Sequence, residues 1–199
     1  RGYRINKAML AEHVASDEGE NLICVCQTFW KYSGGVWKRK EDAQIKARIR
    51  RKIAIRHDAL GCLTSALVDD VFKQLGMILL TTPEFQFNRE LMILNFTNGT
   101  LDLNEGLSTK THRRELYHNI QFPYDFNRDA HCPNWNLFLE SLEFDSDTLK
   151  CLQEWGGYCL LPTVQGSLQK SLFLIGEGAN GKSVFLETLA LVLDNVSHL

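Results

Sequence analysis

The chain has 199 residues, of which 44% are hydrophobic and 23% are charged. This balance allows a buried core and excludes intrinsic disorder of the chain as a whole. Because no run of about 18 apolar residues occurs, neither a membrane-spanning helix nor a membrane partner is expected. The net charge of -2 taken alone argues against a nucleic-acid partner, but the charges are unevenly distributed along the chain.

The first part of the chain predicts a short helix and a β-hairpin. The helix begins at Ile5 and carries Met9 and Val14 on the same side. An apolar and aromatic stretch over 21–32 is followed by a Ser-Gly-Gly turn at 33–35, after which an extended pattern resumes. These features together are typical of a hairpin.

A basic segment follows the hairpin. Nine of the 22 basic residues lie within 38–56, where only Glu41 and Asp42 oppose them. Isoleucine recurs at every fourth position, so we expect a helix over 41–56 with one narrow apolar stripe. The stripe consists of Ile45, Ile49 and Ile53.

Two interpretations of this basic helix remain open. Charge runs are usually solvated surface, but a cluster this rich in arginine also suits a surface that tracks the phosphates of single- or double-stranded DNA. The candidate DNA contacts are Lys46, Arg48, Arg50, Arg51 and Lys52.

The middle of the chain predicts a second helix and a second hairpin. Leucine or valine recurs at every fourth position, which indicates a helix over 60–80. Asn98-Gly99 between two apolar runs is the strongest short signal for a hairpin, which we place over 91–103. A further strand is expected over 114–122, ended by Pro123.

Two more helices are predicted before the C-terminal part. Pro133 suits the first turn of a helix, and a second helix is expected over 146–160, weakened at its end by Gly156 and Gly157. The first helix has one apolar face, formed by Trp135, Phe138, Leu139 and Leu142.

The cysteines and histidines give no metal-binding or nucleophile pattern. Cys24 and Cys26 are two apart in a stretch expected to be extended, which places them on one face of a strand. No second paired cluster at zinc-ligand spacing occurs, so we interpret all six cysteines as buried free thiols. The histidines at 112, 118 and 131 are interpreted as structural. Free thiols and the lack of a secretory signal favour the cytoplasm of a bacterial host or an infected cell, not secretion.

The C-terminal part carries the most informative motif. The nearly all-apolar run 171–175 predicts a strand buried on both faces, as in a parallel sheet. The sequence GEGANGKS at 176–183 follows directly and has the GxxxxGK[ST] spacing of a phosphate-binding loop. A helix with apolar positions at Phe185, Leu186, Leu189 and Val192 comes next.

The residue types in this loop suit binding of ATP and Mg²⁺. Gly176, Gly178 and Gly181 are expected to adopt positive φ and to let backbone amides form an anion nest. Lys182 would reach the β- and γ-phosphates, and Ser183 would place its hydroxyl on Mg²⁺, so both are candidate catalytic residues. The alternative is a glycine turn that only joins a strand to a helix. The candidate nucleotide-binding residues are Gly176, Glu177, Gly178, Ala179, Asn180, Gly181, Lys182 and Ser183.

The sequence after the loop is short. Only 16 residues follow Ser183, which is too few for a sheet of several parallel strands, for an acidic residue on a later strand or for an arginine finger. We therefore expect the chain to be a fragment at its C-terminus and, by itself, to have negligible ATPase activity.

An ordered set of motifs resembles the helicase part of phage and plasmid primases, a branch of the superfamily 3 helicases that includes the poxvirus-type primase–helicase. The loop at 176–183 is close to the family form G-x-G-x-N-G-K-S. The matching segments upstream are YSGGVW at 32–37, NFTNGTLDL at 95–103, PYD at 123–125, AHCPNW at 130–135, FL at 138–139 and LQEWGGY at 152–158.

The resemblance implies an ATP-dependent DNA helicase that acts in DNA replication as a hexameric AAA+ ring. The expected fold is α+β: a mainly helical accessory module with short β-hairpins over 1–168, then over 169–199 the first strand–loop–helix unit of a truncated α/β P-loop NTPase. Two alternatives stay open, namely a P-loop NTPase or kinase of another class, and a non-catalytic DNA-binding or ring-assembly module.

Overall fold

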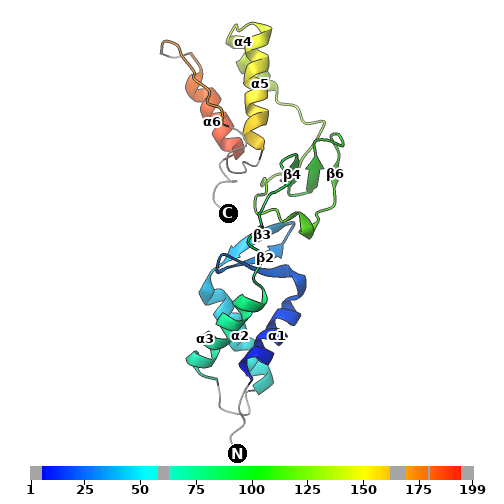
Figure 1. Cartoon of the computed structure of the whole chain (residues 1–199). Helices are drawn as coiled ribbons and strands as arrows, with labels where there is room; N and C mark the ends of the chain where they lie inside the picture. Colours follow the sequence, from blue (N-terminus) through cyan, green and yellow to red (C-terminus); the bar gives the residue numbers. More distant parts are fainter. Residues whose placement is uncertain (1–5, 58–62, 162–168, 179, 194–199) are drawn as a thin grey trace, which may run out of the picture. The chain divides into compact units, whose positions relative to one another are not determined.

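The computed structural model describes residues 6–57, 63–161, 169–178 and 180–193 (Figure 1). The chain divides into two compact units, residues 1–86 (unit 1) and residues 87–199 (unit 2). Over the described ranges the fold is α+β, with six α-helices and two small antiparallel sheets, which confirms the expected fold class at this level. No helix in those ranges is long and apolar enough to cross a membrane.

Unit 1 packs three helices with one sheet. Its elements are α1 (Lys7–Glu18), η1 (Gly19–Asn21), β1 (Leu22–Val25), β2 (Thr28–Ser33), β3 (Val36–Lys40), α2 (Asp42–His57) and α3 (Ser65–Ile78). Side-chain caps begin two of the helices: Asn6 Oδ1 accepts from the Met9 amide at 3.2 Å, and Thr64 Oγ1 accepts from the Leu67 amide at 3.1 Å. The predicted helices 41–56 and 60–80 are thereby confirmed, with α3 starting a few residues later.

The sheet of unit 1 has the antiparallel order β1-β2-β3. The predicted turn at 33–35 is confirmed, but the stretch 21–32 is two strands rather than one. Cys26 and Gln27 form a tight turn between them, with φ of 47° and 63°, the left-handed conformation of a type I′ hairpin. The expectation that Cys24 and Cys26 share a strand face is therefore wrong, because Cys24 is buried in β1 and Cys26 is exposed in the turn. The expectation of buried thiols is also wrong for Cys132 and Cys151, which are exposed.

The core of unit 1 lies where α1, α2 and α3 meet. The predicted isoleucine stripe of α2 is fully buried, together with Val71 and Leu75 of α3. The predicted face of α1 is confirmed at Val14, which is buried, but is wrong at Met9, which is 55% exposed while Leu10 and Ala11 are buried; Ile5 lies outside the described residues. The face is set by the packing of α1 against α3. The spacing of apolar residues within α1 alone does not predict it.

Unit 2 begins with a small sheet of β4 (Ile93–Phe96), β5 (Gly99–Asp102) and β6 (Thr109–Lys110). The predicted hairpin around Asn98-Gly99 is confirmed. The Asn98 side chain donates to the Phe126 carbonyl at 2.9 Å and accepts from the Phe126 amide at 3.0 Å. This asparagine thus fastens segment 124–126 to the hairpin, a structural role for the motif residues found there.

The predicted strand over 114–122 is wrong. Its start is a short 3-10 turn, η3 (Arg114–Leu116), and its end pairs with β4 only through an isolated bridge at Phe122. Side chains satisfy the backbone between these points: the Asn119 amide donates to Asn88 Oδ1, and Asn95 Nδ2 donates to the Ile120 carbonyl, each at 3.1 Å. These side-chain bonds take the place of the hydrogen bonds to a neighbouring strand. The residue pattern of 114–122 alone therefore predicted a strand that does not form.

Three helices complete unit 2, namely α4 (Pro133–Ser141), α5 (Ser146–Leu160) and α6 (Lys182–Leu193). Pro133 stands in the first turn of α4, as predicted. Asp145 caps α5 by accepting from the amides of Asp147 and Thr148. Helices α5 and α6 lie side by side (Figure 1), and the Tyr124 hydroxyl donates to the Val192 carbonyl at 3.2 Å, which joins α6 to the hairpin region.

The predicted strand over 171–175 does not form. Residues 169–177 have no regular structure, and Phe173 and Ile175 are 81% and 94% exposed. A strand needs a neighbour to satisfy its backbone groups, and no described residue pairs with this segment. The predicted strand–loop–helix unit is therefore present as a loop and a helix. The expected boundary at 168/169 falls next to residues outside the described ranges and stays a prediction.

Candidate functional site

The glycine loop leads directly into α6, as the motif requires. Of its three glycines only Gly181 has positive φ, at 81°; Gly176 and Gly178 do not, so that part of the prediction is wrong. A Cβ on Gly176 would meet the side-chain amide of Asn180, which is exposed and can turn away. Ala179 lies outside the described residues.

The Lys182 ammonium closes the loop from inside. It donates to the Gly176 carbonyl at 2.9 Å, to the Glu177 carbonyl at 2.7 Å and to Asn180 Oδ1 at 2.6 Å. In this arrangement oxygens of the loop, rather than an amide nest, face the cation. The cation also stands at the N-terminus of a 12-residue helix, where the helix dipole favours an anion. Ser183 is exposed beside it. Lys182 and Ser183 are the residues here that could hold a phosphate group and Mg²⁺.

Helix α4 supports the start of α6. A Cβ on Gly181 would lie 2.9 Å from Leu142 Cδ2 and 3.0 Å from Phe138 Cε2, so only glycine lets the loop pass this close to the two side chains. One turn later, the buried ring of Phe185 stacks on Trp135 with centroids 5.9 Å apart. Sequence reasoning placed Phe138, Leu142 and Trp135 on an apolar face but did not connect that face with the loop.

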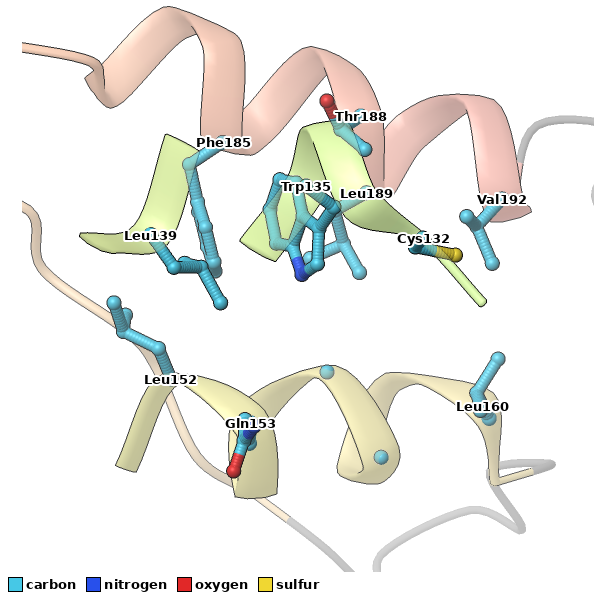
Figure 2. A pocket seen from close by; sticks show the side chains of 12 residues that line it. Cys132, Trp135, Leu139, Leu152, Gln153, Leu160, Phe185, Thr188, Leu189 and Val192 are labelled. Atoms are coloured by element: carbon cyan, nitrogen blue, oxygen red, sulfur yellow. The ribbon is translucent and has the colours of Figure 1, made fainter. Parts of the chain in front are cut away.

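An apolar pocket of about 380 Å³ lies between α4, α5 and α6. Figure 2 shows Trp135 and Leu139 of α4, Phe185 and Leu189 of α6, and Leu152 of α5 around it. A nucleotide site needs polar groups that fix the phosphates and the sugar, and no residue of 176–183 lines this pocket. The loop 176–183 therefore stays the candidate functional site, and the pocket is an apolar space among the three helices.

The structure separates the five candidate DNA contacts of α2 into two groups. Lys46 pairs with Asp69 at 2.8 Å, Lys52 pairs with Asp17 at 2.6 Å, and Arg48 pairs with Glu18. The bond from Asp69 also raises the pKa of Lys46 above its usual value. These three cations tie α2 to α1 and α3.

Arg50 and Arg51 form the second group. Both are exposed, and within the described residues neither takes part in an ion pair. Guanidinium groups of this kind remain available for phosphates.

Unit 2 contains a buried histidine with a strongly lowered pKa. His118 is buried, and its Nε2 has no hydrogen-bond partner among the described residues. Burial first, and then the nearby charges of His112 and Arg113, lower its pKa to about 4. The neutral ring at physiological pH agrees with the structural interpretation made from the sequence.

A comparison with protein families matches residues 6–142 to the family described as D5 N terminal like. The match covers unit 1, the sheet of unit 2 and α4, and it ends before the loop. A search of curated proteins gave no match. With more than half of its residues matched, the chain belongs to the D5 N terminal like family, the N-terminal module of phage and viral primase–helicase proteins.

Proposed function

We propose that the chain is part of an ATP-dependent DNA helicase of superfamily 3, which acts in DNA replication as a hexameric ring. In this proposal the loop 176–183 binds ATP with Mg²⁺. The observation that carries it is the Lys182 ammonium, held inside a glycine loop at the N-terminus of α6. The family supports the primase–helicase context, and the motif at 176–183 supports the nucleotide.

Each site residue has a defined task in this proposal. Lys182 exchanges its three oxygen partners for oxygens of the β- and γ-phosphates, and this exchange is possible because the ammonium is a mobile point charge. Ser183 offers its hydroxyl to Mg²⁺. The metal, when bound, neutralises charge that develops on the phosphates. Gly181 provides the left-handed backbone step that lets α6 begin at Lys182.

Replacing Lys182 by alanine tests the nucleotide site. We expect the 199-residue chain to bind Mg²⁺–ATP in isothermal titration calorimetry and Lys182→Ala to bind on the order of a hundredfold more weakly, because a charge-assisted contact is lost. Lys170→Ala is the matched control, since Lys170 is an exposed lysine outside the loop. Equal affinity of the two variants would instead favour a glycine turn that only joins two segments.

We propose DNA as the partner of α2, with Arg50 and Arg51 as its contacts. The observation that favours these two is that both are exposed and that neither forms an ion pair with a described residue, while Lys46, Arg48 and Lys52 are engaged within unit 1. A phosphate contact made by an engaged cation would first have to break an existing pair. Arg50 and Arg51 have no ion pair among the described residues that would first have to break.

The double variant Arg50→Gln/Arg51→Gln tests this assignment. We expect weaker binding of single-stranded DNA in fluorescence anisotropy and a salt slope reduced by about 1.4, or about 0.7 for each phosphate contact. Lys46→Gln/Lys52→Gln removes the same charge from paired positions and should change the slope less. A larger effect of the lysine pair would show that the ion pairs open to meet DNA.

A further inference from the structure

Helix α4 lies within residues 6–142, which match the family, yet it lies against the glycine loop at 176–183. From this contact we infer that Phe138 and Leu142 are positioning residues, which fix where the loop holds the phosphates of a nucleoside triphosphate. The inference rests on the proposed function. It assigns the placement of the loop to a helix outside the motif.

The first evidence is the contact at Gly181. Two side-chain carbons of α4, Leu142 Cδ2 and Phe138 Cε2, stand within 3.0 Å of the place where a Cβ on residue 181 would be. A side chain at position 181 would therefore collide with α4, so glycine is what lets the loop pack this close to the two side chains, and its φ of 81° is one that glycine adopts readily. Lys182 and Ser183 come next in the chain, so their placement follows from that of Gly181.

A second contact fixes the direction of α6. The Phe185 amide donates to the Gly181 carbonyl at 3.0 Å, which closes the first helical turn. The ring of Phe185 stacks on Trp135, and Trp135 in turn contacts the ring of Phe138 with centroids 5.2 Å apart. The first turn of α6 thus lies against α4 both at Gly181 and at Phe185.

The end of α4 is itself well fixed. Ser141 Oγ donates to the Phe138 carbonyl at 2.7 Å, and the Leu142 amide donates to the Leu139 carbonyl at 3.2 Å. Glu143 then takes a left-handed φ of 52°, and the Asp145 cap starts α5. These bonds and the cap hold Leu142 between the last turn of α4 and the start of α5, and binding sites need support within about 0.5 Å.

The experiment compares two leucines of α4. Leu142 touches the loop, while Leu139 lines the apolar pocket of Figure 2, to which the loop contributes no residue. With the 199-residue chain we expect Leu142→Ala to lower the affinity for Mg²⁺–ATP and for inorganic tripolyphosphate by about tenfold each. Leu139→Ala should lower the melting temperature at least as much and leave both affinities unchanged. Leu142→Met, which restores the volume, should restore binding.

The outcomes are distinguishable. If the unaltered chain binds neither ligand, the proposed function is overturned and the positioning role with it. If the unaltered chain binds and Leu142→Ala binds equally well, only the positioning role is overturned. Equal loss of affinity in Leu139→Ala would show that α4 acts through stability alone, which also overturns it.

Discussion

Replacing Lys31 and Arg48 together by methionine should lower the free energy of unfolding of unit 1 by about 3–5 kcal/mol. The reason is Glu18, whose side chain is only 1% exposed. Lys31 Nζ lies 2.9 Å from Glu18 Oε2, and Arg48 pairs with Glu18 Oε1. Methionine keeps the apolar stems of both partners but leaves a buried carboxylate without a counter-charge.

Amide hydrogen exchange of α1 and α2 in the whole chain measures this loss. Two variants serve as controls. Adding Glu18→Gln to the double variant removes the uncompensated charge and should recover most of the stability. Lys7→Met breaks an exposed pair with Asp70 and should cost less than about 1 kcal/mol. A double variant no weaker than Lys7→Met would contradict the prediction.

Acidification should weaken unit 2 through His118. An unfolded histidine takes up its proton near pH 6.5, whereas burial lowers the pKa of His118 in the folded chain to about 4. Between these values the unfolded state binds more protons, so stability falls as the pH decreases. The loss reaches roughly 3 kcal/mol at pH 4 and is absent above the unfolded pKa.

Two measurements check the histidine prediction. Hydrogen exchange of β4 and β5, corrected for the intrinsic pH dependence, should show the loss in the unaltered chain but not in His118→Phe, which cannot titrate. The ring signals of His118 in NMR should titrate near pH 4. A midpoint near 6.5 would mean that the ring is hydrated and that the expected loss does not occur.

Local signals in the sequence predicted most helices of the fold. The isoleucine stripe of α2, Pro133 in α4 and the turn residues Asn98-Gly99 all act over a few neighbours, and all are confirmed. The errors arose where distant groups decide the structure. Residues 114–122 form no strand because Asn88 and Asn95 satisfy the backbone, and 171–175 form none because no described strand pairs with them.

The candidate site divides in the same way. Spacing alone identified the loop and placed Lys182 at the start of a helix. Spacing could not show that Gly181 rests on α4, because Leu142 is separated from it by a helix and a connector. Charge counting likewise identified α2 as basic, but the acids that neutralise Arg48 and Lys46 belong to α1 and α3. Counting the basic residues of α2 by itself therefore overstates the positive charge that the helix would present to DNA.

The tight turn between β1 and β2 also determines thiol reactivity. It leaves the sulfur of Cys26 open to alkylating reagents, whereas Cys24, two positions earlier, is buried and burial raises the pKa of its thiol. Reagents attack thiolates, so Cys24 can react only when the core of unit 1 opens. The rate at which Cys24 is alkylated therefore measures how often the core opens. The exposed thiol of Cys26 in the same chain serves as the internal reference.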